Sequence, residues 1–215
     1  NWTPARVIGE VPVEEDGSAC FVVPADTSVY FQALDQDRME IRRMRSHVTL
    51  QAGETRGCVG CHESRLNTPR VEWTAALAMR HPPRIPEPPP WGAERLLGYE
   101  WLVQPILDKH CVRCHDGPGS DGGVDLSGTP AADGFFQSFR TLFGRGSGDG
   151  SPAEPWIAVA DRLSNAAVTQ PLEFGSHRSR LVQLLRQDPL HCEEVQLSAD
   201  DWRALVTWID ANAPY

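Results

Sequence analysis

The sequence lacks any long hydrophobic run and is poor in positive charge. No stretch of about 18 apolar residues occurs in its 215 residues, so we expect no membrane-spanning segment. Lys109 is the only lysine, and 20 Lys and Arg residues stand against 29 Asp and Glu, which makes the net charge −9. This negative charge argues against nucleic acid and anionic lipid as partners. A partner protein is expected to be basic.

The given sequence starts at Asn1 without the charged and apolar segments of a signal peptide. We expect a leader to have been removed or to lie on a longer precursor. With 18 prolines, 18 glycines and only 40% hydrophobic residues, the chain is rich in loops. A bound group with a large apolar surface would help such a chain to close its core.

Cysteines are few, yet four of the six stand in two copies of a Cys-x-x-Cys-His pattern. Two thiols at this spacing can add to the vinyl groups of one porphyrin, and the adjacent His then reaches the iron from the proximal side. The motif residues are Cys58, Cys61, His62, Cys111, Cys114 and His115. A shared zinc site is the alternative, but the 49 residues between Cys61 and Cys111 exceed the usual spacing of about 15 to 20. The sequence therefore predicts two covalently attached haem c groups.

The two remaining cysteines are Cys20 and Cys192. Thioether attachment of haem takes place outside the cytoplasm, in compartments that permit disulfides. We therefore predict a periplasmic or other extracytoplasmic location and a disulfide between Cys20 and Cys192, with two free thiols as the alternative.

Residues 6–44 have the short period of strands. The pattern predicts a hairpin closed by the turn 14–17 and followed by residues 20–23, a third strand over 29–34 and a fourth over 39–44. A sheet of this size needs a covering layer, so either the first haem covers it or the chain is the carboxyl-terminal part of a larger protein or complex. The fold class is therefore α+β, with a small antiparallel β segment that carries one haem.

A helical, loop-rich segment follows and carries the second haem. A short helical pattern over 68–80 leads into a proline-rich stretch, 81–92, which we expect to be a stiff strap on the surface. We divide the chain into a β-rich part (1–80), the strap (81–92) and a cytochrome c-like domain (93–215).

Four features are expected in this last domain. A helix with Pro105 near its start delivers Cys111, and the glycine-rich residues 116–151 form a long loop. Ser176 caps a helix that Pro189 stops, and Ser198 begins a final amphipathic helix with a capping-box-like start.

The sequence leaves open which residues bind the two irons opposite the proximal histidines. No methionine follows Met79, so the loop before the last helix offers His191 to the second haem, with His177 as the alternative. For the first haem the candidates are His47, Met44, His81 or an open position. His110 adjoins its own motif and is placed behind it or at the surface. Five-coordinate iron would activate small molecules, whereas six-coordinate iron mainly transfers electrons.

Several phrases are similar to the hydrazine synthase alpha subunit family. They are PVEEDGSACFVVPA (12–25), YFQALD (30–35), MRS (44–46), CVGCHE (58–63) and LSADDWRALVTWIDANAPY (197–215). The resemblance implies a β-rich segment with a catalytic first haem on His62, and a helical segment with an electron-transfer haem between His115 and His191. The position four residues after His62 is a Tyr in hydrazine synthase and is Leu66 here. The resemblance therefore implies the fold and the haem arrangement, and hydrazine synthesis is not expected.

Three functions follow from these patterns. The first is a dihaem cytochrome that passes single electrons between redox partners. The second is a haem enzyme whose open first haem acts on peroxide or a nitrogen species and is fed by the second haem. The third is a β segment that docks onto a larger partner.

Overall fold

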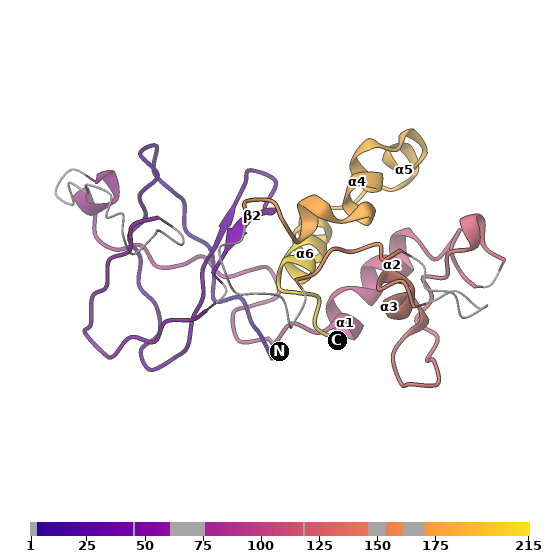
Figure 1. Cartoon of the computed structure of the whole chain (residues 1–215), viewed down its shortest axis with the longest axis horizontal. Coiled ribbons are helices and arrows are strands. Elements are labelled where there is room, and N and C mark those ends of the chain that lie inside the picture. Colours follow the sequence, from indigo (N-terminus) through magenta and orange to yellow (C-terminus); the bar gives the residue numbers. More distant parts are fainter. Residues whose placement is uncertain (1–3, 45, 61–75, 118, 146–153, 161–169) are drawn as a thin grey trace.

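The computed structural model describes residues 4–44, 46–60, 76–117, 119–145, 154–160 and 170–215. The fold is α+β, with a small antiparallel sheet and several short helices (Figure 1). The strands are β1 (Gln32–Leu34) and β2 (Glu40–Arg43). The α-helices are α1 (Tyr99–Leu102), α2 (Gln104–His110), α3 (Gln137–Leu142), α4 (Arg180–Gln187), α5 (Pro189–Glu194) and α6 (Ala199–Asp210). Three 3-10 turns are η1 (Leu77–Arg80), η2 (Asp121–Gly123) and η3 (Ser176–Arg178).

The sheet is smaller than the sequence pattern predicts. Strands β1 and β2 pair antiparallel with a register shift between Ala33 and Leu34, and Val29 forms only a single bridge with Val48. The turn at 14–18 does form, because Gly17 N donates to Glu14 O at 2.8 Å. Its flanking residues nevertheless do not make the expected hairpin ladder in the described part of the chain.

The flanking segments are instead bridged by the proline-rich strap. Glu10 pairs with Glu87, and Phe21 pairs with Arg84. Proline lacks a backbone N–H, so such a segment can donate at isolated positions only and cannot extend a ladder. The strap lies along the β segment with Ile85 83% exposed. Of the helix expected over 68–80, residues 76–80 are described, and Leu77–Arg80 form the 3-10 turn η1.

The helices pack around one hydrophobic cluster. Tyr99 of α1 and Trp208 of α6 are fully buried in it, and Leu107 of α2 is nearly so. Helix α6 begins as predicted, because the Ser198 side chain accepts a hydrogen bond from Asp201 N at 3.1 Å. Pro105 lies in the first turn of α2, also as predicted.

One of the two predictions for the helix after Ser176 is wrong. Ser176 does not cap α4, because the 3-10 turn η3 intervenes and Ser179 takes the cap position. Helix α4 ends at Gln187, just before Pro189, as predicted, and Pro189 also occupies the first turn of α5, where a missing N–H and a fixed φ suit a helix start.

Helix α3 lies inside the segment 116–151, which was expected to be loop. Its Phe139 packs edge-on against Tyr99, with ring centres 5.0 Å apart, and against Tyr215, at 4.8 Å. The helix therefore depends on aromatic partners that are distant in sequence, and periodicity within the segment does not reveal them.

Asp210, the last residue of α6, joins the helices to the sheet. Its carboxylate accepts hydrogen bonds from Glu40 N at 2.9 Å, from Ser176 N at 2.6 Å and from Ser176 Oγ at 2.8 Å. Gln32 Nε2 donates to Glu40 Oε2 and to the carbonyl oxygen of Asp210, both at 2.6 Å. Figure 1 shows β2 beside α6 at this junction.

The expected disulfide is not formed in the structure, where Cys20 and Cys192 are both free thiols. Cys192 lies on α5, and its Sγ is 3.5 Å from the carbonyl oxygen of Leu185 on α4. Figure 1 shows α5 at the opposite end of the molecule from the N-terminal β segment that contains Cys20. The separation of these two elements is the physical reason that the thiols do not meet.

Among the described helices, none has the length and apolar character needed to cross a membrane.

Candidate haem-binding site

The second motif, residues 111–115, continues the helical course of α2. Cys111 N donates to Leu107 O at 2.8 Å, and His115 N donates to the carbonyl oxygens of Cys111 and Val112, both at 3.1 Å. Residues three and four apart in such a turn lie on one face, so Cys111, Cys114 and His115 share a face. Cys111 is half-buried and Cys114 is exposed. Burial raises the pKa of the Cys111 thiol to about 11.

The end of α2 is held by α6. Lys109 Nζ lies 2.9 Å from Asp201 Oδ2, and His110 Nε2 lies 3.1 Å from the same oxygen. Burial tends to raise the pKa of Asp201, but the hydrogen bonds from Lys109, His110 and Ser198 outweigh it and lower the pKa to about 2. His110 thus contacts Asp201 of α6 and anchors the turn that carries Cys111.

His115 faces a second imidazole. Its ring is parallel to that of His191, with the ring centres 6.4 Å apart and the planes 6° from parallel. Its Nδ1 is buried and has no hydrogen-bond partner among the described residues. The chain is held in place by the hydrogen bond from Leu126 N to the carbonyl oxygen of His115, at 2.9 Å. The structure therefore brings together the two histidines that the sequence paired.

His191 is positioned by the start of α5. Asp188, the N-cap of this helix, accepts a hydrogen bond from His191 N at 3.0 Å, and the same oxygen lies 2.8 Å from His191 Nδ1. A neutral imidazole that donates through Nδ1 has its lone pair on Nε2, which is the form that binds metals. The hydrogen bonds from the His191 side chain and backbone lower the pKa of Asp188.

The spacing of these rings fits an iron between them. An iron bound by one nitrogen of each ring, at about 2.0 Å and with about 1.2 Å from that nitrogen to the ring centre, would require the centres to be about 6.4 Å apart. The centres of His115 and His191 are 6.4 Å apart. The two motif thiols lie on the His115 side of this arrangement, so the residues present fit a haem c.

A side chain from within the motif ties α5 to it. Arg113 Nη2 donates to the backbone oxygen of Glu194 at 2.9 Å and to its Oε2 at 2.6 Å. Both side chains are more than half exposed, so the ion pair adds little to stability. Its geometric effect is larger, because it holds α5 and therefore His191 next to residues 111–115.

The other candidate ligands lie elsewhere. His177 Nε2 is 2.9 Å from Asp35 Oδ2, in the turn between β1 and β2, so this side chain joins the helices to the sheet. His47 and His81 are exposed, and Met44 is half-buried. Among the described residues, no group of three or more His, Cys, Asp or Glu is arranged to hold a metal ion.

The first motif is described in part. Cys58 is an exposed free thiol. Cys61, His62 and Leu66 lie outside the described residues, so the ligands of the first haem stay a prediction.

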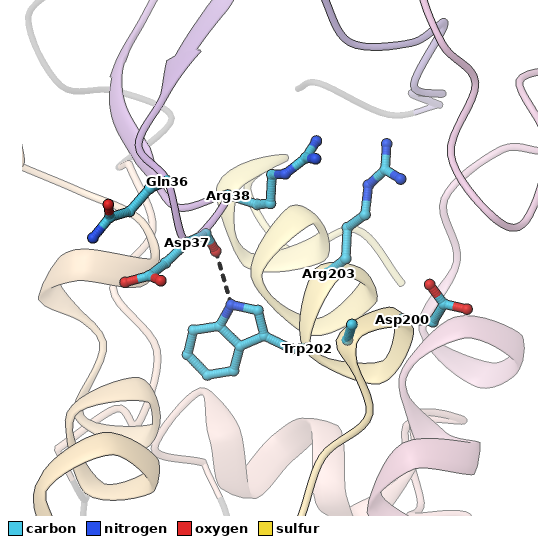
Figure 2. A pocket seen from close by; sticks show the side chains of 7 residues that line it. Gln36, Asp37, Arg38, Asp200, Trp202 and Arg203 are labelled. Carbon is cyan, nitrogen blue, oxygen red and sulfur yellow. Dashed lines mark hydrogen bonds between the residues drawn. The ribbon is translucent and has the colours of Figure 1, made fainter. Parts of the chain in front are cut away.

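A separate open cavity of about 370 Å³ lies between the β1–β2 turn and the start of α6 (Figure 2). Trp202 Nε1 donates to the backbone oxygen of Asp37 at its edge, at 2.8 Å. Arg38 and Arg203 line the cavity, but both guanidinium groups pair with Glu10. The cavity therefore lies where the β1–β2 turn meets α6, and both of the arginines that line it are paired.

Asp188, Arg113 and Asp201 were not predicted as parts of the site. For Asp188 a signal exists in the sequence, because Asp followed by Pro is a common N-cap and N1 pair and His191 then falls three residues on. Neither Arg113 nor Asp201 has such a signal, since their partners Glu194 and Lys109 are 81 and 92 residues away.

Comparison with known proteins supports the resemblance at a coarse level. Residues 1–63 match the family described as hydrazine synthase alpha subunit middle domain. The match covers the β segment and ends just after the first motif. No curated protein and no solved structure matches the chain.

Proposed function

We propose that this chain is a dihaem c-type cytochrome that passes single electrons between redox partners. The observation that carries the proposal is the parallel pair His115 and His191 beside the thiols of Cys111 and Cys114. A haem bound there would supply an iron that takes up and releases one electron. Cys111 and Cys114 would hold its edge covalently.

The two imidazoles favour electron transfer over catalysis in this proposal. A haem held between His115 and His191 would have a ligand on each face, which would leave no position for a substrate at the iron. Cys114 is exposed, and we place the approach of a partner on this side of the site. The net charge of −9 would favour a basic redox protein at that edge.

The proposal extends to the first motif and to the compartment. Cys58, Cys61 and His62 have the same spacing as the second motif, so they would hold a second haem c. Thioether attachment requires an extracytoplasmic setting, so we place the protein in a periplasm or an equivalent space.

A second candidate function is a haem enzyme. Its support is the match of residues 1–63 to the middle domain of the hydrazine synthase alpha subunit, whose end coincides with the first motif. In this alternative the first haem has an open position, acts on peroxide or a nitrogen species, and receives electrons from the second. Carbon monoxide separates the two functions, because an open ferrous site binds it and a His/His site does not.

The test combines haem counting with two variants. A pyridine haemochrome assay is expected to give two covalently bound haems per chain, and one haem would contradict the proposal. His191→Ala is expected to convert one haem from low spin to high spin and to open it to carbon monoxide. His177→Ala is the matched control, because its imidazole contacts Asp35 and not His115, and it should stay low-spin. The reverse outcome would make His177 the ligand.

A further inference from the structure

Asp188 makes two contacts with a single carboxylate oxygen. Its Oδ2 accepts a hydrogen bond from His191 N at 3.0 Å, which caps α5, and lies 2.8 Å from His191 Nδ1. We propose that Asp188 is a positioning residue that fixes the orientation and tautomer of His191 and thereby lowers the reduction potential of the second haem. The inference rests on the proposed function, because it requires His191 to be an iron ligand.

Packing alone does not hold the His191 ring. Helix α5 has six residues and none of them is buried, and the His191 side chain is 27% exposed. Among the described residues, the hydrogen-bond partner of this imidazole is Asp188. Rotation of the ring would break that bond, so the bond selects the orientation in which His191 and His115 are 6° from parallel.

The charge of Asp188 acts through the same bond. A carboxylate that accepts the Nδ1 proton makes the imidazole a more basic ligand at Nε2. A more basic ligand stabilises ferric iron more than ferrous iron, because the ferric ion carries the larger positive charge. Asp188 should therefore favour the oxidised state of the second haem.

A purely structural role for Asp188 as a helix cap is the alternative, and variants separate the two. Asn is as good an N-cap as Asp, and its side-chain oxygen can accept the same two hydrogen bonds, so Asp188→Asn removes only the charge. Asp188→Ala removes the charge, the cap and the imidazole contact.

Glu193→Gln is the matched control. Glu193 is an exposed carboxylate on the same helix whose side chain makes no hydrogen bond or ion pair within the described part of the chain. The substitution removes an equal charge without touching His191.

The experiment measures the midpoint potential and the carbon monoxide affinity of the holoprotein. Asp188→Asn is expected to stay low-spin and to shift the preference for ferric over ferrous iron about tenfold, which raises the midpoint by about 59 mV for one electron. Asp188→Ala is expected to raise it at least as far and to bind carbon monoxide about 10- to 100-fold more tightly, because His191 then competes less well for the iron. Glu193→Gln should shift the midpoint less than Asp188→Asn.

Two results would overturn the inference. One is an Asp188→Asn midpoint equal to that of the wild type, and the other is an equal shift in Glu193→Gln. Failure of the proposed function looks different, because His191→Ala would then leave every haem low-spin. If Asp188→Ala does not fold, Asp188→Asn decides alone, since it keeps the cap.

Discussion

Glu40 and Asp210 illustrate, at the scale of single residues, how buried carboxylates join the two parts of this protein. Glu40 is 4% exposed and Asp210 is 1% exposed. Burial raises the pKa of Glu40 to about 7, although Arg43 Nε lies 2.6 Å from its Oε1 and favours the charged form. Burial also raises the pKa of Asp210. At this junction, burial therefore favours the protonated form of both carboxyl groups over the charged form.

The Glu40 carboxyl predicts a stability that depends on pH. Because its pKa is about 7 in the folded protein and 4.5 as a free group, the folded state holds a proton between these values that the unfolded state releases. Its contribution to stability is complete below pH about 4.5 and is lost as the pH rises through about 7. Glu40→Gln keeps the hydrogen-bonding shape without this titration.

Chemical denaturation at pH 5 and pH 8 checks this prediction. The wild type should lose roughly 2 to 3 kcal/mol more of its unfolding free energy between these pH values than Glu40→Gln does. Glu15→Gln, at an exposed carboxylate in the turn, should follow the wild type. Parallel pH profiles for the wild type and Glu40→Gln would contradict the assignment.

Among the helices, contacts made by the terminal residues fix where each short helix lies. Helix α6 has a side-chain cap at Ser198 and a buried face that includes Leu205 and Ile209. Its first turn also holds Asp201, which contacts Lys109 and His110 just before the second motif. The start of α6 therefore sets both its own stability and the position of residues 111–115.

The Ser198 cap gives a prediction for this element. Ser198→Ala should lower the unfolding free energy by about 1 kcal/mol, because Asp201 N loses its side-chain acceptor. Ser198→Asn should retain most of the stability, since Asn is also a preferred cap. Thermal unfolding followed by circular dichroism measures both variants. Equal losses would show that the hydroxyl does not act as the cap.

At the scale of the whole molecule, the β segment and the helices interlock at Gly175. This residue has φ of +74°, its N–H donates to Ala158 O at 2.9 Å, and a Cβ there would overlap Asp210 Oδ1. Left-handed backbone suits glycine, and the space is taken by the carboxylate that binds Ser176 and Glu40. Gly175 thus allows the close approach on which the junction depends.

Gly175→Ala and Gly17→Ala form a matched pair. Gly17 has φ of +80° and no atom within 4 Å of a built Cβ, so alanine there brings only backbone strain, about 1 to 2 kcal/mol. Gly175→Ala adds an overlap with Asp210 and should destabilise by roughly 1 to 3 kcal/mol more. Denaturant titration of both variants checks the difference. Equal losses would show that the approach to Asp210 is not tight.

Local chemistry determined much of this protein from its sequence. The turn that begins at Glu14, the Ser198 cap and the place of Pro105 all depend on residues close together in the chain. Each of these needs only one turn of backbone or one loop, so the pattern suffices to predict it.

Only the tertiary structure decided the rest, because the partners are far apart in sequence. The strap bridges two segments instead of letting them form a hairpin, and α3 forms against Tyr99 and Tyr215. Asp210 meets Glu40 across 170 residues, and His191 becomes parallel to His115 through contacts of α5 with Arg113. Such pairings are selected by packing and by the need of buried polar groups for partners, neither of which a local pattern contains.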